Sequence, residues 1–511
     1  MLDVLLTTIN AKYIHAAFGL RYLFANLGDL KDNAEIMEFD IQTRPIDIAE
    51  AILNKNPKIV GIGVYIWNIR EVEDLVGILK KVNPEIVIAL GGPEVSYEWE
   101  NQPAVHLCDY LIRGEGDIAF AELCKNILSG SRPESKVISP PLPELNNVKM
   151  PYQYYNDEDL KHRIIYVEAS RGCPFKCQFC LSSLDKQVRY FPIEKLLGEF
   201  KELIKRGGRH FKFVDRTFNV NIEQGRRIIE FCLKNYCGGI FFHFELIPDR
   251  LPEQWRDLIK QFPRGSLQFE VGIQTFNPEV AERIERRQNY QTVEENIRFL
   301  RFETDAYLHT DLIVGLPGED LESFAKGFDR LVKMRPQEIQ VGILKRLKGA
   351  PISQHTEEWG MVYNPKPPYD LLKNNLISFS QMQSIKRFAR FWDIIANSGN
   401  FVKTTELILG KNEEMSKRSP FNEFMTLSQW LFEKIGRTTA ISRTKLLELL
   451  FEYLMTVKGY EPKEAADILV EDCRRVGFRE FPECLKNYGL DLSVNSQKRA
   501  NGLTRQQKHL C

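Results

Sequence analysis

The chain lacks a net charge and a long apolar run, and we expect no signal peptide at its start. Its 69 Lys and Arg residues balance 69 Asp and Glu residues, so no global field would attract nucleic acid or an acidic membrane surface. No apolar run reaches the roughly 20 residues that a membrane-spanning helix needs. The segment Met1–Asn10 is too short and too soon interrupted for a signal peptide. We therefore expect no membrane segment and no nucleic-acid partner.

Cysteine is scarce, at 10 of 511 residues, yet three cysteines lie within eight residues. Cys173, Cys177 and Cys180 form the pattern C-x-x-x-C-x-x-C. Tetrahedral zinc sites and four-cysteine clusters need a fourth protein ligand, and none lies nearby. Three thiolates on one loop suit a [4Fe-4S] cluster with one iron left open. The alternative is a chance cluster of buried or zinc-binding thiols.

The other seven cysteines show no spacing that predicts a disulfide framework. Together with an oxygen-sensitive cluster, they indicate a reducing cytoplasm. They are Cys108, Cys124, Cys232, Cys237, Cys473, Cys484 and Cys511.

The segment Glu168–Cys180, with Phe179 before its last cysteine, resembles the motif of the radical S-adenosylmethionine (SAM) superfamily. The resemblance implies that SAM chelates the open iron and that reduction of the cluster releases a 5'-deoxyadenosyl radical. It also implies cofactor contacts on later strands. These are Asp215 and Asn219 for the amino and carboxylate groups, where the common Gly-Gly-Glu is missing, and Glu270, Gln274, Asp311 and Gly315 for the ribose and adenine. Glu245 is a further charge at a strand end.

Residues 1 to about 130 alternate apolar strands with helices, which predicts a parallel sheet covered on both faces. The first strand is not followed by G-x-G-x-x-G, which argues against a dinucleotide fold. Such sheets bind ligands at the carboxyl ends of their strands. The loops expected there carry Asn10, His15, Trp67, Asn68, Gly91, Gly92, Pro93, Glu94, Gly114, Glu115 and Gly116.

These loops, above all Gly91–Glu94 and Arg113–Asp117, resemble the cobalamin-binding domain of one large radical SAM class. Classical cobalamin domains supply a lower axial histidine from D-x-H-x-x-G. Here His15 is followed by Gly19 but lacks the aspartate, so a solvent-facing or helix-capping His15 stays open beside a cobalt ligand. A flavodoxin-like receiver or an empty Rossmann-like module is the alternative for the whole domain.

The predicted fold class is α/β with three domains. A Rossmann-like doubly wound sheet (1–135) precedes a linker (136–160), a partial (β/α)6 TIM-type barrel (161–347) and a mainly α-helical domain (348–492). The last domain is similar to an uncharacterised domain at the end of some cobalamin-type radical proteins, and we expect one of its helices over Tyr369–Ile395. The polar tail (493–511) is expected to be disordered.

The resemblance favours a cobalamin-dependent radical SAM enzyme that methylates an unactivated carbon. Its partners would be an unknown organic substrate and a reductant such as flavodoxin or ferredoxin, and we expect a monomer. Three alternatives stay open. One is a radical cyclase, rearrangement or other redox enzyme of the class. Another is a methylthiotransferase on RNA or protein, which would usually need a second cysteine cluster. The third is a non-catalytic cobalamin sensor, against which the intact cysteine motif argues.

Overall fold

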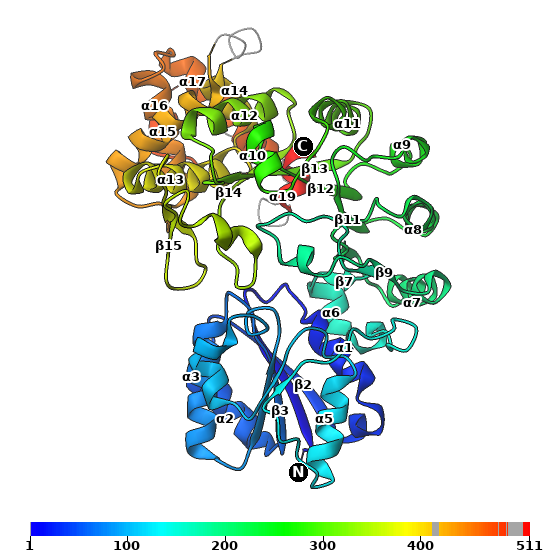
Figure 1. Cartoon of the computed structure of the whole chain (residues 1–511). Coiled ribbons are helices and arrows are strands. Elements are labelled where there is room, and N and C mark those ends of the chain that lie inside the picture. Colours follow the sequence, from blue (N-terminus) through cyan, green and yellow to red (C-terminus); the bar gives the residue numbers. More distant parts are fainter. Residues whose placement is uncertain (1, 411–417, 479, 487, 489–503, 511) are drawn as a thin grey trace. The chain divides into compact units, whose positions relative to one another are not determined.

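The computed structural model describes residues 2–410, 418–478, 480–486, 488 and 504–510. Two six-stranded sheets are followed by a group of helices (Figure 1). The chain divides into two compact units, and the division falls within strand β11 (Phe241–Leu246). Unit 1 comprises Met1–Phe244 with two later segments, Lys345–Ser353 and Asn364–Asp370. Unit 2 comprises the rest of the chain.

The first sheet lies wholly in unit 1 and has the strand order β2-β1-β3-β4-β5-β6 with parallel pairing throughout. Separate apolar cores cover its two faces, and Figure 1 shows α2 and α3 on one side with α1 and α5 on the other. The predicted doubly wound sheet is confirmed. Its strands are Val4–Asn10, Ala34–Asp40, Ile59–Gly63, Val87–Gly91, Tyr110–Ile112 and Val137–Ile138; its helices α1 to α5 are Phe18–Asn26, Pro45–Lys55, Ile69–Val82, Pro103–Leu107 and Ala119–Leu128.

The segment that we expected to be an unpacked linker contains regular structure. Val137–Ile138 pairs with β5 and adds the sixth strand. Helix α6 (Asp157–His162) begins at a capping box between Asn156 and Asp159. Asp159 also accepts a hydrogen bond from the buried Arg21 of α1 at 2.6 Å. The sequence did not predict these elements, because a strand of two residues and a helix of six are too short to show a hydrophobic period.

The second sheet has the order β14-β13-β12-β11-β10-β7, so its six strands follow the chain from one edge to the other. Neighbouring pairs within each unit are parallel. This is the strand arrangement expected of an incomplete β/α barrel. The other five strands are β7 (Ile165–Val167), β10 (His210–Phe213), β12 (Leu267–Gln274), β13 (Tyr307–Val314) and β14 (Glu338–Ile343); a small hairpin pairs β8 (Ser170–Arg171) with β9 (Arg189–Tyr190). The helices α7 to α12 are Ile193–Lys205, Ile222–Lys234, Arg256–Lys260, Pro278–Arg283, Tyr290–Phe302 and Leu321–Lys333.

The C-terminal part of unit 2 is helical, as predicted, and packs on helix α12 through aromatic side chains. Phe328 of α12 meets Phe388 and Trp392 of α13 with ring centroids 5.3 and 4.9 Å away. The helices are α13 (Phe379–Ile395), α14 (Val402–Leu409), α15 (Pro420–Ile435), α16 (Arg443–Thr456), α17 (Pro462–Val476), α18 (Glu483–Lys486) and α19 (Arg505–Leu510).

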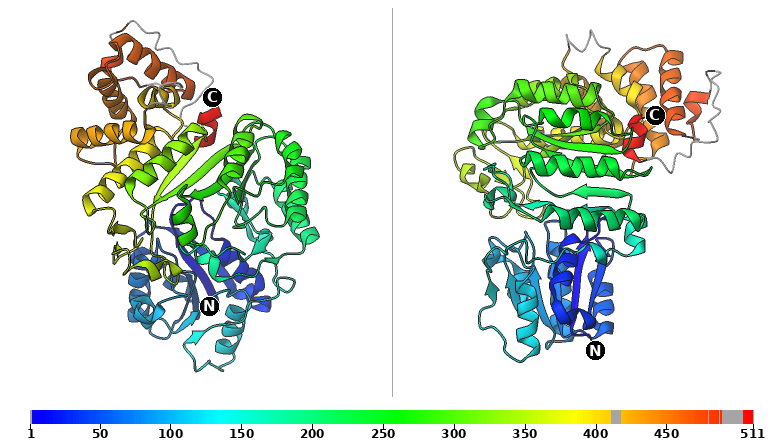
Figure 2. Two further views of the ribbon diagram at one scale, coloured as in Figure 1. Left: turned by 45° about the horizontal axis from the view of Figure 1, so that its top comes forward. Right: turned by 90° about the vertical axis from the view of Figure 1, so that its right-hand side faces the viewer.

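Two expectations for this part were wrong in detail. The helix predicted over Tyr369–Ile395 begins only after Ser378, whose side chain caps it. The preceding residues instead form strand β16 (Leu371–Lys373), which pairs with β15 (Val362–Tyr363). In the tail, Arg505–Leu510 forms α19, which Figure 2 shows beside strands of the second sheet. Gln506 of α19 contacts Gln268 of β12 at 3.0 Å. Apart from Thr504, the rest of the predicted tail, with Cys511, lies outside the described residues.

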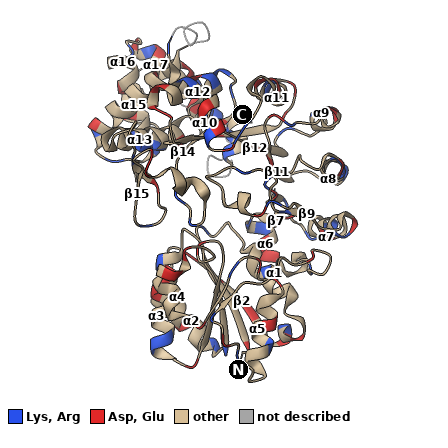
Figure 3. Cartoon of the chain, viewed as in Figure 1, with Lys and Arg blue, Asp and Glu red and all other residues tan. Residues whose placement is uncertain are grey.

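The charge pattern agrees with the balanced composition. Figure 3 shows acidic and basic residues interspersed along the helices. Within the described part of the chain, no helix combines the length and the apolar character needed to cross a bilayer.

Candidate active site

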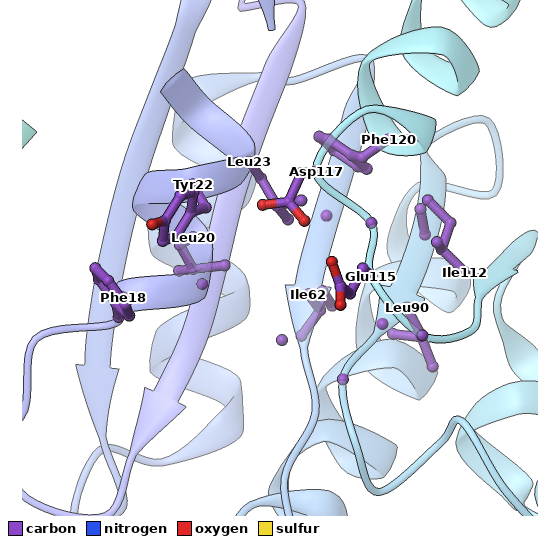
Figure 4. Close-up of a pocket in the computed structure, with 18 of the residues that line it drawn as sticks. Phe18, Leu20, Tyr22, Leu23, Ile62, Leu90, Ile112, Glu115, Asp117 and Phe120 are labelled. Carbon is purple, nitrogen blue, oxygen red and sulfur yellow. The ribbon is translucent and has the colours of Figure 1, made fainter. Parts of the chain in front are cut away.

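A cavity of about 250 Å³ lies at the carboxyl ends of strands β3, β4 and β5 in unit 1. Figure 4 shows Tyr22 and Leu23 entering it from α1, and Glu115 and Asp117 from the loop between β5 and α5. The predicted glycines Gly91, Gly92, Gly114 and Gly116 all line it, as does Glu115. Arg171, two residues before Cys173, also reaches it. The carboxyl-end loops thus form a pocket, as such sheets usually do.

Glycine is required at two positions in its wall. A Cβ on Gly61 would lie 2.7 Å from the Phe120 ring. Gly92 has a φ of +114°, and a Cβ there would lie 2.4 Å from the Val64 carbonyl oxygen. A side chain at Gly61 would displace the Phe120 ring of α5, and one at Gly92 would collide with the backbone of Val64 and strain its own backbone. The glycines therefore keep the cavity open and let backbone line it.

The loop after β3 presents an aromatic surface. The rings of Tyr65 and Trp67 stack with centroids 4.5 Å apart and planes 3° apart. Trp67 is partly exposed and donates its indole N–H to the carbonyl of Ile9 at 3.1 Å. Asn68 is fully buried and bonds to Thr8, to the Ile9 carbonyl and to the amide of Tyr65. Asn68 therefore shapes the loop. Trp67 stacks on Tyr65 and does not line the cavity, so its contact with a cofactor stays a prediction.

Asn10 and His15, at the end of β1, are both engaged within the protein. Asn10 is buried and donates to Glu38 at 2.8 Å. His15 Nδ1 lies 2.7 Å from the hydroxyl of Tyr166 on β7. Burial, with the nearby charges of Lys12 and Lys212, lowers the pKa of His15. A neutral imidazole can ligate a metal through its other nitrogen, so the hydrogen bond leaves the cobalt-ligand role of His15 as a prediction.

Glu94, which we expected to contact the cofactor, is buried against the late segments of unit 1. Its carboxylate accepts the Tyr369 hydroxyl at 2.6 Å and pairs with Lys348 at 3.0 Å. Glu98, further along the same loop, pairs with Arg346 at 2.9 Å. Pro93, the residue before Glu94, is exposed and does not line the cavity. Glu94 therefore holds the Gly91–Gly92 loop against the late segments of unit 1.

The cysteine loop follows strand β8. Cys173 and Cys177 are buried and Cys180 is half-buried; none of the nine described cysteines forms a disulfide. Cys173 donates its amide to the Asp185 carbonyl at 2.8 Å, and Cys180 donates to Cys177 at 3.1 Å. Gly172, with a φ of +89°, allows the tight entry. Phe179 is half-buried between the last two cysteines.

The donor set fits an iron-sulfur cluster, since three thiols from one loop are the ligands such clusters use. In the described part of the chain, no three His, Cys, Asp or Glu side chains are already arranged around a single metal ion. The ligand role of Cys173, Cys177 and Cys180 therefore stays a prediction from the motif.

Arg171 joins the cysteine loop to the cavity. Its guanidinium contacts Glu115 and Asp117 at 2.7 Å each, and Glu168 at 3.1 Å. Arg189 of β9 makes a second contact with Glu115. Burial alone would lower the pKa of Arg171, but the three carboxylates raise it, so it stays a cation. The network holds the loop after β5 against the strand that leads into Cys173.

Asp215, predicted to bind the SAM amino group, is buried beneath the cysteine loop. It accepts the Ser170 hydroxyl at 2.5 Å and the Ala169 amide at 3.0 Å. Burial raises its pKa to about 7. Asn219 is buried as well. Within unit 1, Asp215 therefore holds the strand before the cysteines, and its contact with a cofactor stays a prediction.

The other predicted SAM contacts lie in unit 2. Register pairs Glu270 with His309 and Gly272 with Asp311, so Glu270 and Asp311 belong to adjacent strands, on one half-buried face. His309 lies between Asp311 (3.1 Å) and Glu338 (3.3 Å). Burial would lower the pKa of His309, but these two carboxylates raise it to about 10. Gln274, with a φ of +73°, and Gly315, with +89°, mark sharp turns at the strand ends; Glu245 lies on β11.

Three family models match successive parts of the chain. The B12 binding domain covers residues 4–124, the Radical SAM superfamily 167–331, and the Protein of unknown function DUF4080 357–508. The chain is a radical SAM protein with a B12 binding domain. These families imply a [4Fe-4S] cluster, SAM and cobalamin as cofactors, as predicted. The glycine-lined cavity lies in the B12 binding domain, and the three cysteines lie in the radical SAM domain.

Several curated proteins are similar in sequence to this radical SAM protein. It is 31% identical to an uncharacterized methyltransferase of Pyrococcus horikoshii over 34% of the chain and 43% of the relative. It is 24% identical to the cobalamin-dependent radical SAM methyltransferase TokK of Streptomyces tokunonensis over 63% of the chain and 52% of TokK. It is 24% identical to an anaerobic magnesium-protoporphyrin IX monomethyl ester cyclase of Rubrivivax gelatinosus over 55% of each. The chain thus spans about half the length of these relatives.

A solved structure of TsrM from Kitasatospora setae, a radical SAM methyltransferase, has the same fold. The TM-score is 0.58 at 16% identity, over 74% of the radical SAM protein and 81% of TsrM.

Sequence reasoning missed several residues of this site. Arg171 lay inside the quoted motif, but nothing in the sequence marked Glu115 and Asp117 as its partners. Lys348 and Tyr369 gave no signal, because only the tertiary structure brings them to Glu94.

Proposed function

We propose that the protein is a cobalamin-dependent radical SAM enzyme that methylates an unactivated carbon of an organic substrate. The observation that carries this proposal is the Arg171 network, which ties the cysteine loop to the glycine-lined cavity within one unit. When bound, the cluster and SAM supply one-electron chemistry and cobalamin supplies a carrier for the methyl group. The names of TokK and TsrM support methyl transfer.

The residues of the chain have distinct roles in this proposal. The thiols of Cys173, Cys177 and Cys180 hold the cluster. The glycine-lined cavity, with Leu90, Ile112 and Phe120 among its walls, takes an apolar part of cobalamin. Trp67 faces the ligand from the loop after β3. Arg171 and Glu94 keep the loops of the B12 binding domain in place.

A radical cyclase is the second candidate, because the magnesium-protoporphyrin ester cyclase matches a similar share of the chain. A reductant of the flavodoxin or ferredoxin type, a monomeric state and a cytoplasmic location belong to the proposal as well.

The test is anaerobic reconstitution with iron, sulfide and cobalamin, followed by incubation with SAM and a reductant. We expect iron-sulfur and corrin absorbance, release of deoxyadenosine, and formation of S-adenosylhomocysteine. Replacing Cys173, Cys177 and Cys180 by Ala should abolish iron binding and deoxyadenosine release. Cys237→Ala, at an exposed position, is the matched control and should retain both.

The outcomes separate the candidates. Deoxyadenosine without S-adenosylhomocysteine would favour the cyclase over the methyltransferase. Retention of iron by the triple variant, or corrin binding with no SAM cleavage in the wild type, would contradict a radical SAM enzyme.

A further inference from the structure

The helical part of unit 2 contains a second cavity, of about 370 Å³, within the DUF4080 region. It lies between α13, the start of α16 and α19. None of its walls belongs to the B12 binding domain or the second sheet. This cavity is therefore separate from the site described above.

Basic side chains dominate its wall. Arg390, Arg443, Arg505 and Lys508 line it with a single carboxylate, Asp393, so the lining has a formal charge of +3. Glu338, which is not part of the lining, also pairs with Arg505 at 3.1 Å. Asp393 is already shared between Arg390 at 3.0 Å and Arg505 at 2.6 Å.

The remaining two cations are not neutralised. Arg443 and Lys508 form no ion pair with any residue that the structure describes; Arg443 instead lies over the Phe478 ring, 5.1 Å from its centroid. Burial, with the charges of Arg443 and Arg505, lowers the pKa of Lys508. Like charges held together in a partly buried wall repel one another, and an anion would relieve that repulsion.

One neighbouring feature adds positive charge to the cavity, and a second adds an unpaired hydrogen-bond acceptor. Arg443 is the first residue of α16, a helix of 14 residues, so the positive end of its dipole adds to the charge. Asn400, 8% exposed, lines the cavity, and its side-chain oxygen has no hydrogen-bond partner among the described residues. This oxygen is an acceptor, so it would take a hydrogen bond from a hydroxyl group of the ligand and would not contact its anionic oxygens.

We propose that this cavity binds a small, multiply charged oxyanion, such as an organic phosphate or a polycarboxylate. Cations on α16 and α19 would bind the anionic group, and a volume of about 370 Å³ suits a small molecule. Arginine forks are well matched to phosphate and carboxylate oxygens. The proposal gives the DUF4080 region a ligand of its own, and it does not depend on the radical chemistry.

The test is calorimetric titration of the full-length protein with pyrophosphate and, in a separate arm, with citrate. Binding of either probe supports an oxyanion site, and their relative affinities distinguish phosphate from carboxylate. We expect Arg443→Gln and Lys508→Gln each to weaken binding about 10-fold or more, as the loss of a charged hydrogen bond would. Lys463→Gln, at an exposed position on α17, should leave affinity unchanged.

Thermal unfolding without ligand shows whether each variant is folded. If Arg443→Gln is not, Lys508→Gln carries the test. Absence of binding to both probes in the wild type would overturn the proposal. Equal affinity in the lining variants and in Lys463→Gln would overturn it as well. Neither result would bear on deoxyadenosine release.

Discussion

Removal of Arg171 should destabilise unit 1 strongly. The guanidinium contacts three carboxylates at 2.7 to 3.1 Å, and the side chains of Arg171, Asp117 and Glu168 are 12%, 7% and 12% exposed. In Arg171→Met, Glu115 keeps Arg189, but Asp117 and Glu168 lose their cation. Breaking a buried ion pair from one side costs about 3–5 kcal/mol. We expect a loss of that size in the free energy of unfolding, measured with urea.

A second substitution separates lost packing from lost charge. Asp117→Asn in the Arg171→Met background removes one uncompensated buried charge, so it should recover at least about 1 kcal/mol. Asp117→Asn in the wild type should be destabilising. Arg132→Met, at an exposed position, is the control and should change stability by less than about 0.5 kcal/mol.

The penalty should also depend on pH. Burial already raises the pKa of Glu168, and Arg171 acts against that rise. Without Arg171 the folded-state pKa should rise further above its unfolded value, so protonation favours the folded form and stability is lost as pH increases above about 4.5. The variant should therefore be less destabilised at pH 5 than at pH 8. A loss below about 1 kcal/mol, or the same loss at both pH values, would refute this reasoning.

Three further results are expected. Gly91→Val should place methyl groups in the cavity at a position where a Cβ meets only ordinary contacts, so we expect cobalamin affinity to fall more than 10-fold with an unchanged thermal midpoint. Gly198→Ala, inside helix α7 and far from the cavity lining, should leave the affinity unchanged and raise the midpoint slightly, because Ala favours a helix more than Gly does. Glu94→Gln should weaken the contacts to Lys348 and Tyr369 and lower stability by about 1–3 kcal/mol; a midpoint equal to that of the exposed-site control Glu100→Gln would contradict the pinning role. The pKa of His309 is raised to about 10, so its contribution to the free energy of unfolding is complete below about pH 6.5 and is lost as pH rises toward 10. His309→Gln should therefore reduce the change of stability with pH in that range. Parallel stability profiles for the variant and the wild type would count against the ion pairs of His309 with Asp311 and Glu338.

Much of the fold could be predicted, because long segments with a regular hydrophobic period indicate their secondary structure directly. The apolar runs around Ile59 and Val87 and the repeated strand and helix units specify parallel sheets. Short elements escaped prediction: β6 has two residues and β16 three. The start of α13 was misplaced because the helical period continues upstream of Ser378, and only the cap marks where the helix begins.

Some features of the candidate site could be predicted from the sequence, and others could not. The cysteine motif is local, since three thiols within eight residues must share a loop wherever that loop lies. The glycines of the loops after β4 and β5 could also be predicted from the sequence, because paired glycines in such loops indicate that the backbone must come close to another group. The structural roles of Asn68, Glu94 and Asp215 could not be predicted from the sequence. Each had been expected to meet a cofactor, and each is buried in hydrogen bonds to other parts of the protein.

The sequence alone determined the chemistry of the chain: thiols spaced for a cluster, glycine-rich loops after parallel strands, and a helical C-terminal part. These features depend on neighbours in sequence and on short-range geometry. Only the tertiary structure decided which charges meet. Arg171 lies more than 50 residues from Asp117, and Tyr369 lies 275 residues from Glu94. Pairing over such separations depends on how the sheets and loops pack, and no local pattern encodes it.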